Sequence, residues 1–345
     1  MKLLKILLSP LAFLYKIVTD FRNYLYNIGH FKSFSFQIPL IVVGNLTVGG
    51  TGKTPHVEYL IRYLTTKYKV GVLSRGYGRK TKGYIMADEN ETATTIGDEP
   101  MQYFLKYGKD ISVSVCESRA FAVPCIAYEK PETEVIVLDD AFQHRKVKAQ
   151  FNILLSDYKR PFYDDYLLPS GLLRESRAGA NRADAIIVSK CPLQISETEK
   201  KTIREAIQKY APSKPVFFTT IEYAKPLALF NENLIIENYK NSILFAGLAN
   251  IEPLETFIKT QFDIVETLDF KDHYKYKTLD IERIKSLSAN SVNTCLITTE
   301  KDMVKLLPFK DLLKDLPIFY IPIEIRFLEN ESEFQNLLLE KIKEV

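Results

Sequence analysis

The sequence predicts an α/β fold, with a mostly parallel β-sheet that carries helices on both faces, and a smaller α/β domain that follows it in the sequence. Short apolar runs alternate with helical stretches along most of the 345 residues. This alternation is typical of strands that crossover helices bury on both faces. A glycine-rich turn follows the first apolar run, at 41–43, and leads into a helical stretch. The chain is long enough for two hydrophobic cores.

The first half of the chain supplies the larger sheet. Helices are expected at about 55–67, at Arg119–Glu129 and at Glu197–Tyr210. The apolar runs predict strands at Val70–Ser74, Ile111–Val115, Val135–Leu138, Phe151–Leu155, Ala185–Val188 and Val216–Thr220. Ligands of such sheets bind at the carboxyl ends of the strands, so the polar residues that follow these runs are candidate site residues.

A second, shorter series of elements follows a polar segment at 221–241. Strands are expected at Ile243–Gly247, Ile264–Asp269, Thr294–Thr298 and Ile318–Ile323, with helices near 253–261, at Ile281–Ser288 and at Ser332–Val345. We therefore expect an N-terminal amphipathic segment at 1–32, a nucleotide-binding domain at 33–225 and a smaller α/β domain at 226–345. The smaller domain is expected to contribute to the active-site cleft.

Composition excludes several classes of function. The formal net charge is only +3, and the sequence has no basic stripe with interleaved aromatic residues, so it does not predict a nucleic-acid partner. Its four cysteines are scattered without a C-x-x-C pair. This spacing favours a reducing compartment, by default the cytoplasm, over a disulfide framework or a zinc site.

The N-terminal segment 1–32 is apolar and cationic, with Asp20 as its only acid. Lys5, Pro10 and Lys16 interrupt every window of the about 20 apolar residues that a transmembrane helix needs. No convincing signal-peptidase site follows. Two interpretations stay open: an amphipathic helix on an anionic membrane surface, and a helix that covers the domain's own core.

The segment Ile41–Pro55, IVVGNLTVGGTGKTP, has the strand, glycine-rich turn and helix start of a phosphate-binding P-loop. Lys53 is expected to reach the β- and γ-phosphates, and the Thr54 hydroxyl suits a Mg²⁺ ligand. The residues expected to bind nucleotide are Thr47, Val48, Gly49, Gly50, Thr51, Gly52, Lys53 and Thr54. Thr47 stands where the common motif has its first glycine, so the loop is a variant of the motif. The predicted fold is thus of the P-loop NTPase type.

The run at 135–138 ends in two acids, Asp139 and Asp140. This is the form of a Walker B strand, whose carboxylate holds Mg²⁺ opposite the P-loop threonine. Gln143 and His144 follow at once and are expected to line the same crevice. For His144, a hydrogen-bonded structural role is an equal alternative.

A second pair of acids, Asp98 and Glu99, precedes the helical stretch 101–107. Either carboxylate can accept a proton or bind Mg²⁺, while the competing interpretation makes Asp98 the cap of the helix.

Further polar groups follow other strands. They are Tyr77, the arginines Arg174 and Arg177, which can bind an anion, and the neighbours Asp272 and His273, which can relay a proton. The alternatives are a plain turn at Tyr77, arginines that are simply exposed, and a structural Asp–His pair. No guanine-reading motif is complete, so ATP is the expected nucleotide.

In their order along the chain, these motifs resemble those of the tetraacyldisaccharide 4′-kinases of lipid A biosynthesis. The resembling segments are GNLTVGGTGKTP (44–55), LSRGYGR (73–79), GDEP (97–100), VLDDAFQH (137–144), LLPSGLLRE (167–175), FAGLAN (245–250), FKDHY (270–274) and TTEKDMVKL (298–306). They extend over nearly the whole chain, and the family's P-loop has the same form at Thr47. Leu172 stands where the family usually has proline, and Tyr274 where a second histidine is common.

The resemblance implies transfer of the ATP γ-phosphoryl group, with Mg²⁺, to the 4′-hydroxyl of a tetraacylated glucosamine disaccharide 1-phosphate, which gives lipid IVA. It implies that Asp98, paired with His273, acts on the acceptor hydroxyl. Glu99 and Asp139 are implied to lie close to Mg²⁺. Substrate phosphate is then a candidate partner for the two arginines.

The resemblance also implies a peripheral protein at the cytoplasmic face of the inner membrane of a Gram-negative bacterium, held there by segment 1–32 and expected to be a monomer. The lipid precursor would keep its acyl chains in the bilayer. The alternative is a P-loop NTPase switch or metallochaperone, which hydrolyses nucleotide without an acceptor. The motifs GDEP and FKDHY would then have no special purpose.

Overall fold

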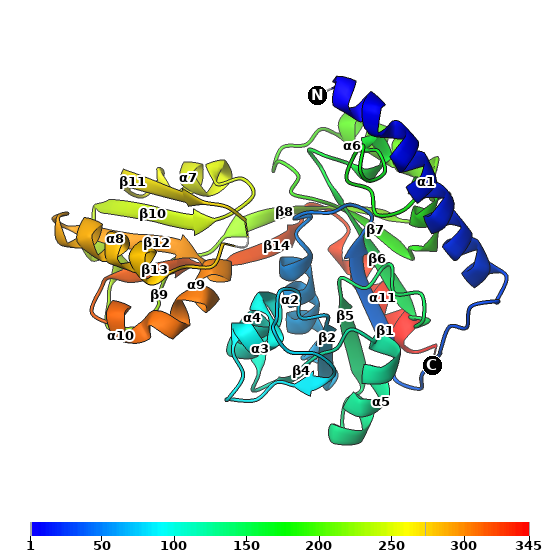
Figure 1. The fold of residues 1–345 in the computed structure, drawn as a ribbon, viewed down its shortest axis with the longest axis horizontal. Helices are drawn as coiled ribbons and strands as arrows, with labels where there is room; N and C mark the ends of the chain where they lie inside the picture. Colours follow the sequence, from blue (N-terminus) through cyan, green and yellow to red (C-terminus); the bar gives the residue numbers. More distant parts are fainter. Residues whose placement is uncertain (1, 273, 345) are drawn as a thin grey trace.

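The structure is a computed structural model that describes residues 2–272 and 274–344. It has a nine-stranded and a five-stranded sheet, each with helices packed on it. Two strands of the larger sheet extend toward the smaller one (Figure 1). The α/β class and the mostly parallel sheets confirm the expected fold.

The larger sheet carries the glycine-rich turn. Its strands lie in the order β14 (Ile323–Phe327), β8 (Val216–Tyr223), β7 (Ala185–Ser189), β6 (Phe151–Asp157), β1 (Leu40–Asn45), β5 (Val135–Asp139), β2 (Val70–Ser74), β4 (Ile111–Val115) and β3 (Ile85–Met86). The helices of this unit are α2 (Lys53–Leu64), α3 (Ala93–Ile96), α4 (Asp98–Tyr107), α5 (Arg119–Glu129), α6 (Glu197–Gln208) and α11 (Glu331–Ile342). The pairs β14–β8 and β3–β4 are antiparallel.

Both faces of the larger sheet are buried, as the apolar runs predict. In β1, Leu40 and Val42 belong to one hydrophobic cluster, and Ile41 and Val43 to the other. Successive side chains of a strand point to opposite faces, so a continuous apolar run is what a sheet covered on both sides requires.

The smaller sheet lies in the order β11 (Asp263–Phe270), β10 (Asn241–Gly247), β12 (Thr294–Thr299), β13 (Ile318–Ile321) and β9 (Leu227–Ala228). Its helices are α7 (Glu252–Ile258), α8 (Thr278–Ala289), α9 (Glu300–Leu306) and α10 (Lys310–Leu313). Short 3₁₀ segments at Phe162–Asp164, Arg177–Arg182, Ile236–Asn238 and Leu307–Phe309 lie in the connections.

The C-terminal boundary differs from the expected one. The prediction assigned all of 226–345 to the smaller domain and ran one strand through 318–323. In the structure the ladder with β12 ends at Ile321, and Pro322, which has no N–H to donate to a ladder, separates β13 from β14. β14 then pairs with β8, and α11 packs Phe334 on the larger sheet. The chain therefore leaves the larger unit along β8 and returns along β14 (Figure 1). The division into separate domains stays a prediction.

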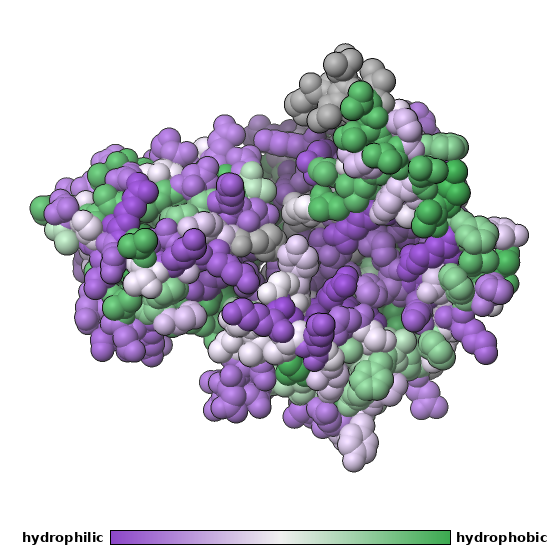
Figure 2. Space-filling view, in the orientation of Figure 1, coloured by the Kyte–Doolittle hydropathy of each residue, from purple (hydrophilic) through white to green (hydrophobic). Residues whose placement is uncertain are grey.

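From residue 7 onward, helix α1 (Lys2–Asn27) does not bury an apolar face in the core. None of its side chains from 7 to 27 is buried, and Leu7, Leu11, Leu14, Val18 and Phe21 are each more than half exposed. Figure 2 shows hydrophobic side chains gathered along this helix. This exposure favours the membrane-surface interpretation of the N-terminal segment over the core-covering one, and the role of the segment stays a prediction. Within 2–272 and 274–344, no helix is long and apolar enough to span a membrane.

The two units meet where α4 packs on α9. Met101 of α4 shares a hydrophobic cluster with Met303 of α9. Beside it, the ammonium of Lys106 lies 2.7 Å from a Glu58 oxygen and 2.8 Å from a Glu300 oxygen, and both carboxylates are almost fully buried. Burial and the charge of Glu58 raise the pKa of Glu300. One lysine thus holds an acid from each unit.

The return of the chain predicts a stability effect at α11. The Phe334 ring is 1% exposed and packs against Phe327 and Phe217, with ring centroids 5.0 and 5.3 Å away. We expect Phe334→Ala to lower the free energy of unfolding by roughly 3–5 kcal/mol, measured by urea titration. Asn336→Ala, an exposed position on the same helix, is the control. An equal effect of both substitutions would contradict the packing described here.

Candidate active site

The glycine-rich turn connects β1 to α2. The expected helix begins at Lys53, two residues earlier than predicted, so Lys53 and Thr54 lie in its first turn. Gly52, directly before the helix, has φ +80°, a conformation that side chains disfavour. The helix N-terminus adds partial positive charge to the turn.

Donors from outside the turn occupy its carbonyl groups. Ser189 Oγ donates to Thr51 O at 2.8 Å, Arg160 donates to Val48 O at 3.3 Å, and Lys190 Nζ donates to Gly50 O. Peptide carbonyls repel phosphate oxygens. Their engagement by these donors therefore favours an anion in the turn.

Asp139 ends β5, the strand next to β1, and is buried at 5% exposure. Its Oδ2 accepts a hydrogen bond from Ser74 Oγ at 3.3 Å, while its buried Oδ1 has no hydrogen-bond partner among the described residues. Burial raises the pKa of Asp139 to about 6, and the charges of Asp140 and Glu99 add to the shift, against Lys53 and Arg119. A carboxylate that is buried beside two other acids, with one oxygen lacking a hydrogen-bond partner, is suited to bind a cation.

Asp140 is the acid that contacts the P-loop lysine. It has φ +45°, and its Oδ2 lies 3.7 Å from Lys53 Nζ. Arg174 donates to both of its oxygens, at 2.9 and 3.2 Å. Burial alone would raise the pKa of Asp140, but the charges of Lys53 and Arg174 outweigh burial and lower it.

The donor set fits Mg²⁺ only together with a phosphate. Within 2–272 and 274–344, no group of three His, Cys, Asp or Glu residues could hold a metal ion. Mg²⁺ commonly takes one or two carboxylates and fills its other positions with water and substrate phosphate. Thr54 and Asp139 can supply such a partial set, and Glu99 lies close enough to shift the pKa of Asp139.

The two predicted arginines are placed differently. Arg174 reaches Asp140, whereas Arg177 donates from Nε and Nη2 to Asp165 O and from Nη1 to Tyr210 Oη. Arg177 thus holds the loop at Asp165 in place and does not reach Asp140. The sequence, in which the two arginines are only three residues apart, did not predict this difference.

Gln143 and His144 follow β5 as expected. Gln143 Nε2 donates to Asn45 O at 2.9 Å and to Glu175 Oε1 at 3.0 Å, which ties the end of β1 to the loop that carries Arg174. Burial lowers the pKa of His144 to about 4, and the charges of Arg119 and Arg75 add to the shift. His144 is therefore neutral at pH 7. Tyr77 is 71% exposed.

Arg119 is a member of this region that the sequence analysis did not single out. It is fully buried, and its Nη2 donates to Asp139 O at 3.0 Å. Burial lowers its pKa to about 10, against the charges of Asp139 and Asp140. The only feature of the sequence that could have pointed to Arg119 is its charge at the start of a mostly apolar helix, α5.

Asp98 and Glu99 occupy the first turn of α4, and Gly97 caps the helix. The interpretation of Asp98 as the helix cap is therefore wrong. Gly97 has φ +99°, and a Cβ there would lie 3.1 Å from Gly76 Cα, so the two turns pack closely. Asp98 Oδ2 lies 4.0 Å from Lys305 Nζ of the smaller unit.

The second predicted acceptor-side motif comes from the smaller unit. Asp272 accepts a hydrogen bond from Lys301 of α9 at 2.7 Å. His273 lies outside the described residues, so its predicted pairing with Asp98 stays a prediction. Lys301 and Lys305 were not predicted as site residues.

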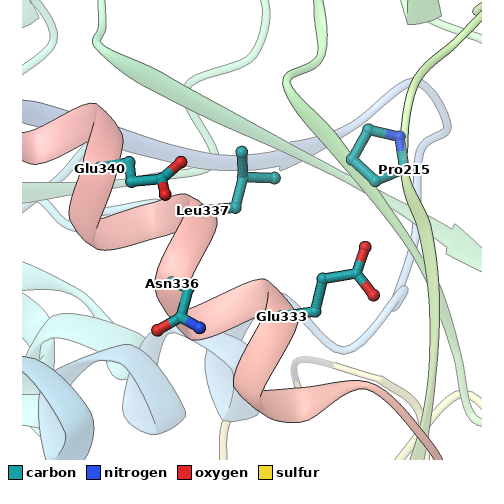
Figure 3. A pocket seen from close by; sticks show the side chains of 5 residues that line it. All are labelled: Pro215, Glu333, Asn336, Leu337 and Glu340. Carbon is teal, nitrogen blue, oxygen red and sulfur yellow. The ribbon is translucent and has the colours of Figure 1, made fainter.

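A surface depression elsewhere has no part in this arrangement. Figure 3 shows it between α11 and the residue before β8, lined by Pro215, Glu333, Asn336, Leu337 and Glu340. It lies at the amino end of β8, while the P-loop follows the carboxyl end of β1.

Comparison with known proteins agrees with the motifs. The family model described as "Tetraacyldisaccharide-1-P 4'-kinase" matches residues 4–343. The tetraacyldisaccharide 4′-kinase of Flavobacterium johnsoniae is 43% identical over 346 aligned positions, covering 100% of this chain and 99% of the relative. That of Cytophaga hutchinsonii is 39% identical, covering 98% and 96%.

A solved structure shares the whole fold. The crystal structure of LpxK from Aquifex aeolicus, an "apo" form in complex with ATP, superimposes with a TM-score of 0.76 and 31% identity, covering 98% of this chain and 99% of that one. The family match, the identities and the shared fold extend over both units. The chain belongs to the tetraacyldisaccharide-1-P 4′-kinase family, whose members are phosphotransferases with an alcohol acceptor.

Proposed function

We propose that the residues at the carboxyl ends of the strands of the larger sheet bind ATP and Mg²⁺. We propose further that the protein transfers the γ-phosphoryl group to the 4′-hydroxyl of a tetraacylated glucosamine disaccharide 1-phosphate, giving lipid IVA. The observation that carries this proposal is the meeting of Lys53, Asp139 and the Asp140–Arg174 pair at the P-loop, with Asp98 of α4 beside Lys305 of the smaller unit. Family membership and the ATP complex of the A. aeolicus relative support the two substrates.

The P-loop side supplies positive charge. Phosphoryl transfer depends mainly on positioning and on neutralising the charge of the transferred group. Lys53 can move its ammonium from Asp140 to a phosphate oxygen at little cost, because the pair is 3.7 Å apart and partly exposed. Arg174 keeps Asp140 charged and fixed while this happens. When bound, Mg²⁺ would be held by Thr54 and Asp139, near Glu99, and would neutralise phosphate charge.

The acceptor side supplies the base. We assign to Asp98 the acceptance of the 4′-hydroxyl proton as the new P–O bond forms. Its place in the first turn of α4, against the smaller unit, puts it between the two units. His273 and Asp272 are proposed as its partners from the smaller unit.

The membrane surface is the proposed location, at the cytoplasmic face of the inner membrane. Five of the exposed apolar residues of α1 recur at intervals of three and four, at 7, 11, 14, 18 and 21, and so form a stripe along the helix. Such a stripe buries apolar area in the headgroup boundary of a bilayer. The stripe belongs to a helix that also contacts the site, since Tyr15 donates to Arg174 O at 2.7 Å.

Lys53→Ala tests the P-loop role. We expect transfer of labelled γ-phosphate to the lipid acceptor to fall by roughly a hundredfold or more, because a charge aimed at the transferred group is lost. Lys67→Ala, an exposed position just beyond the same helix, is the control. Comparable activity of Lys53→Ala and the control would remove the P-loop lysine from the mechanism.

Asp98→Asn tests the base. The substitution keeps the size of the side chain but removes its ability to accept the proton, so kcat should fall by roughly 10²–10⁴-fold while the KM for ATP stays within about twofold. Steady-state kinetics at saturating acceptor measure both. A variant with the kcat of the unmodified protein would refute the assignment.

Leu14→Glu with Phe21→Glu tests the membrane surface. Both positions are exposed, at 59% and 60%, so the fold should not change, whereas two charges in the stripe should weaken binding to anionic vesicles in sedimentation. Phe121→Glu with Tyr128→Glu, on the exposed apolar face of α5, is the matched control. Equal binding by both double variants would exclude the stripe.

A further inference from the structure

Lys305 is a buried lysine at the contact between the two units. Its side chain is 6% exposed, and its Nζ lies 2.9 Å from Asp302 Oδ1 and 4.0 Å from Asp98 Oδ2. Lysine is almost never buried unless it is paired. Here the two acids come from different units: Asp302 from α9 and Asp98 from α4.

Asp302 is held in place by several donors. It is fully buried, and its Oδ2 accepts hydrogen bonds from Gly247 N at 2.8 Å and from Thr299 Oγ1 at 2.8 Å. These donors end β10 and β12. A Cβ at Gly247 would lie 3.2 Å from Asp302 Oδ1 and 3.0 Å from Lys271 O, so the space around the acid is closed. Asp302 therefore anchors the ammonium of Lys305.

We infer that Lys305 is a positioning residue that holds the Asp98 carboxylate at the place where the acceptor hydroxyl reacts; this inference rests on the proposed role of Asp98. An ammonium anchored on one side attracts the carboxylate on its other side and restricts its rotamers. A displacement of about 1 Å of a reacting group can cost a hundredfold in rate.

Helix α9 carries a second lysine that binds a predicted site acid. Lys301, one turn before Lys305, lies 2.7 Å from Asp272. Residues four apart lie on the same face of a helix. One face of α9 thus sets Asp98 of the larger unit relative to Asp272 of the smaller one, and a change in the packing of α4 on α9 would alter their separation.

The test must not leave a buried charge behind. Lys305→Met alone would strand the Asp302 carboxylate, which can cost several kcal/mol and unfold the protein. The variant to use is Lys305→Met with Asp302→Asn, in which both charges go and the amide oxygen can still accept from Gly247 N. Lys310→Met, at an exposed position, is the control, and thermal unfolding checks that all variants are folded.

The kinetics are measured in the full-length protein with and without Asp98→Asn. We expect the 302/305 variant to lower kcat by roughly tenfold or more with the KM for ATP within about twofold, and to cause no further loss when Asp98 is already asparagine. A loss of the same factor in both backgrounds would mean that Lys305 does not act through Asp98, and an unchanged kcat would also overturn the inference.

The failure of the proposed function has a different signature. If Asp98→Asn alone kept the kcat of the unmodified protein, the base assignment would be refuted, and the positioning role would fall with it. If Asp98→Asn were impaired while the 302/305 variant were not, only the positioning role would be refuted. Restored kcat in Lys305→Arg, which keeps the charge and leaves Asp302 paired, would support the inference further, and a kcat as low as that of the 302/305 variant would contradict it.

Discussion

The ion pair between Asp140 and Arg174 joins the parts of the chain on which the candidate site depends. Its carboxylate follows β5 and contacts Lys53. The backbone N–H of Arg174 donates to Leu46 O at 2.7 Å, at the start of the P-loop, and its carbonyl accepts from Tyr15 of α1. The phosphate turn, the strand-end acids and the exposed helix are therefore fixed to one another. A shift in any one of them would change the distance between Lys53 and its acid.

The site is also divided between two units that meet through a few buried charges. Two antiparallel strands, β8 and β14, connect the units, and the contact of α4 with α9 includes Lys106 between Glu58 and Glu300. Buried pairs of this kind add little net stability, but breaking one is costly. They favour one arrangement of the units over others, which suits a reaction whose proposed base, Asp98, lies in the larger unit while its proposed partners, Asp272 and His273, belong to the smaller one.

Much of this arrangement follows from the sequence, since apolar runs and a strand–turn–helix pattern are local signals. They predict most strands of both sheets, the P-loop and the acids at 139 and 140, but not the two-residue strands β3 and β9. The return of the chain through β14 was missed because pairing with β8 joins residues a hundred positions apart, and a single apolar run spans the crossing at Pro322. Arg119 and Lys305 were missed for a similar reason, since only the fold reveals which acid a buried cation meets. The cap assigned to Asp98 failed because Gly97, with its positive φ, takes that position.

The central claim is that the charged residues at the carboxyl ends of the strands of the larger sheet promote transfer of a phosphoryl group to a lipid acceptor rather than to water. The most direct measurement supplies the unmodified protein with γ-labelled ATP, Mg²⁺ and tetraacyldisaccharide 1-phosphate in mixed micelles, and follows the label in lipid and in free phosphate. The account predicts label in the lipid product, with little free phosphate in the presence or absence of acceptor. Release of free phosphate with no labelled lipid would contradict it and would indicate a nucleotide-hydrolysing switch.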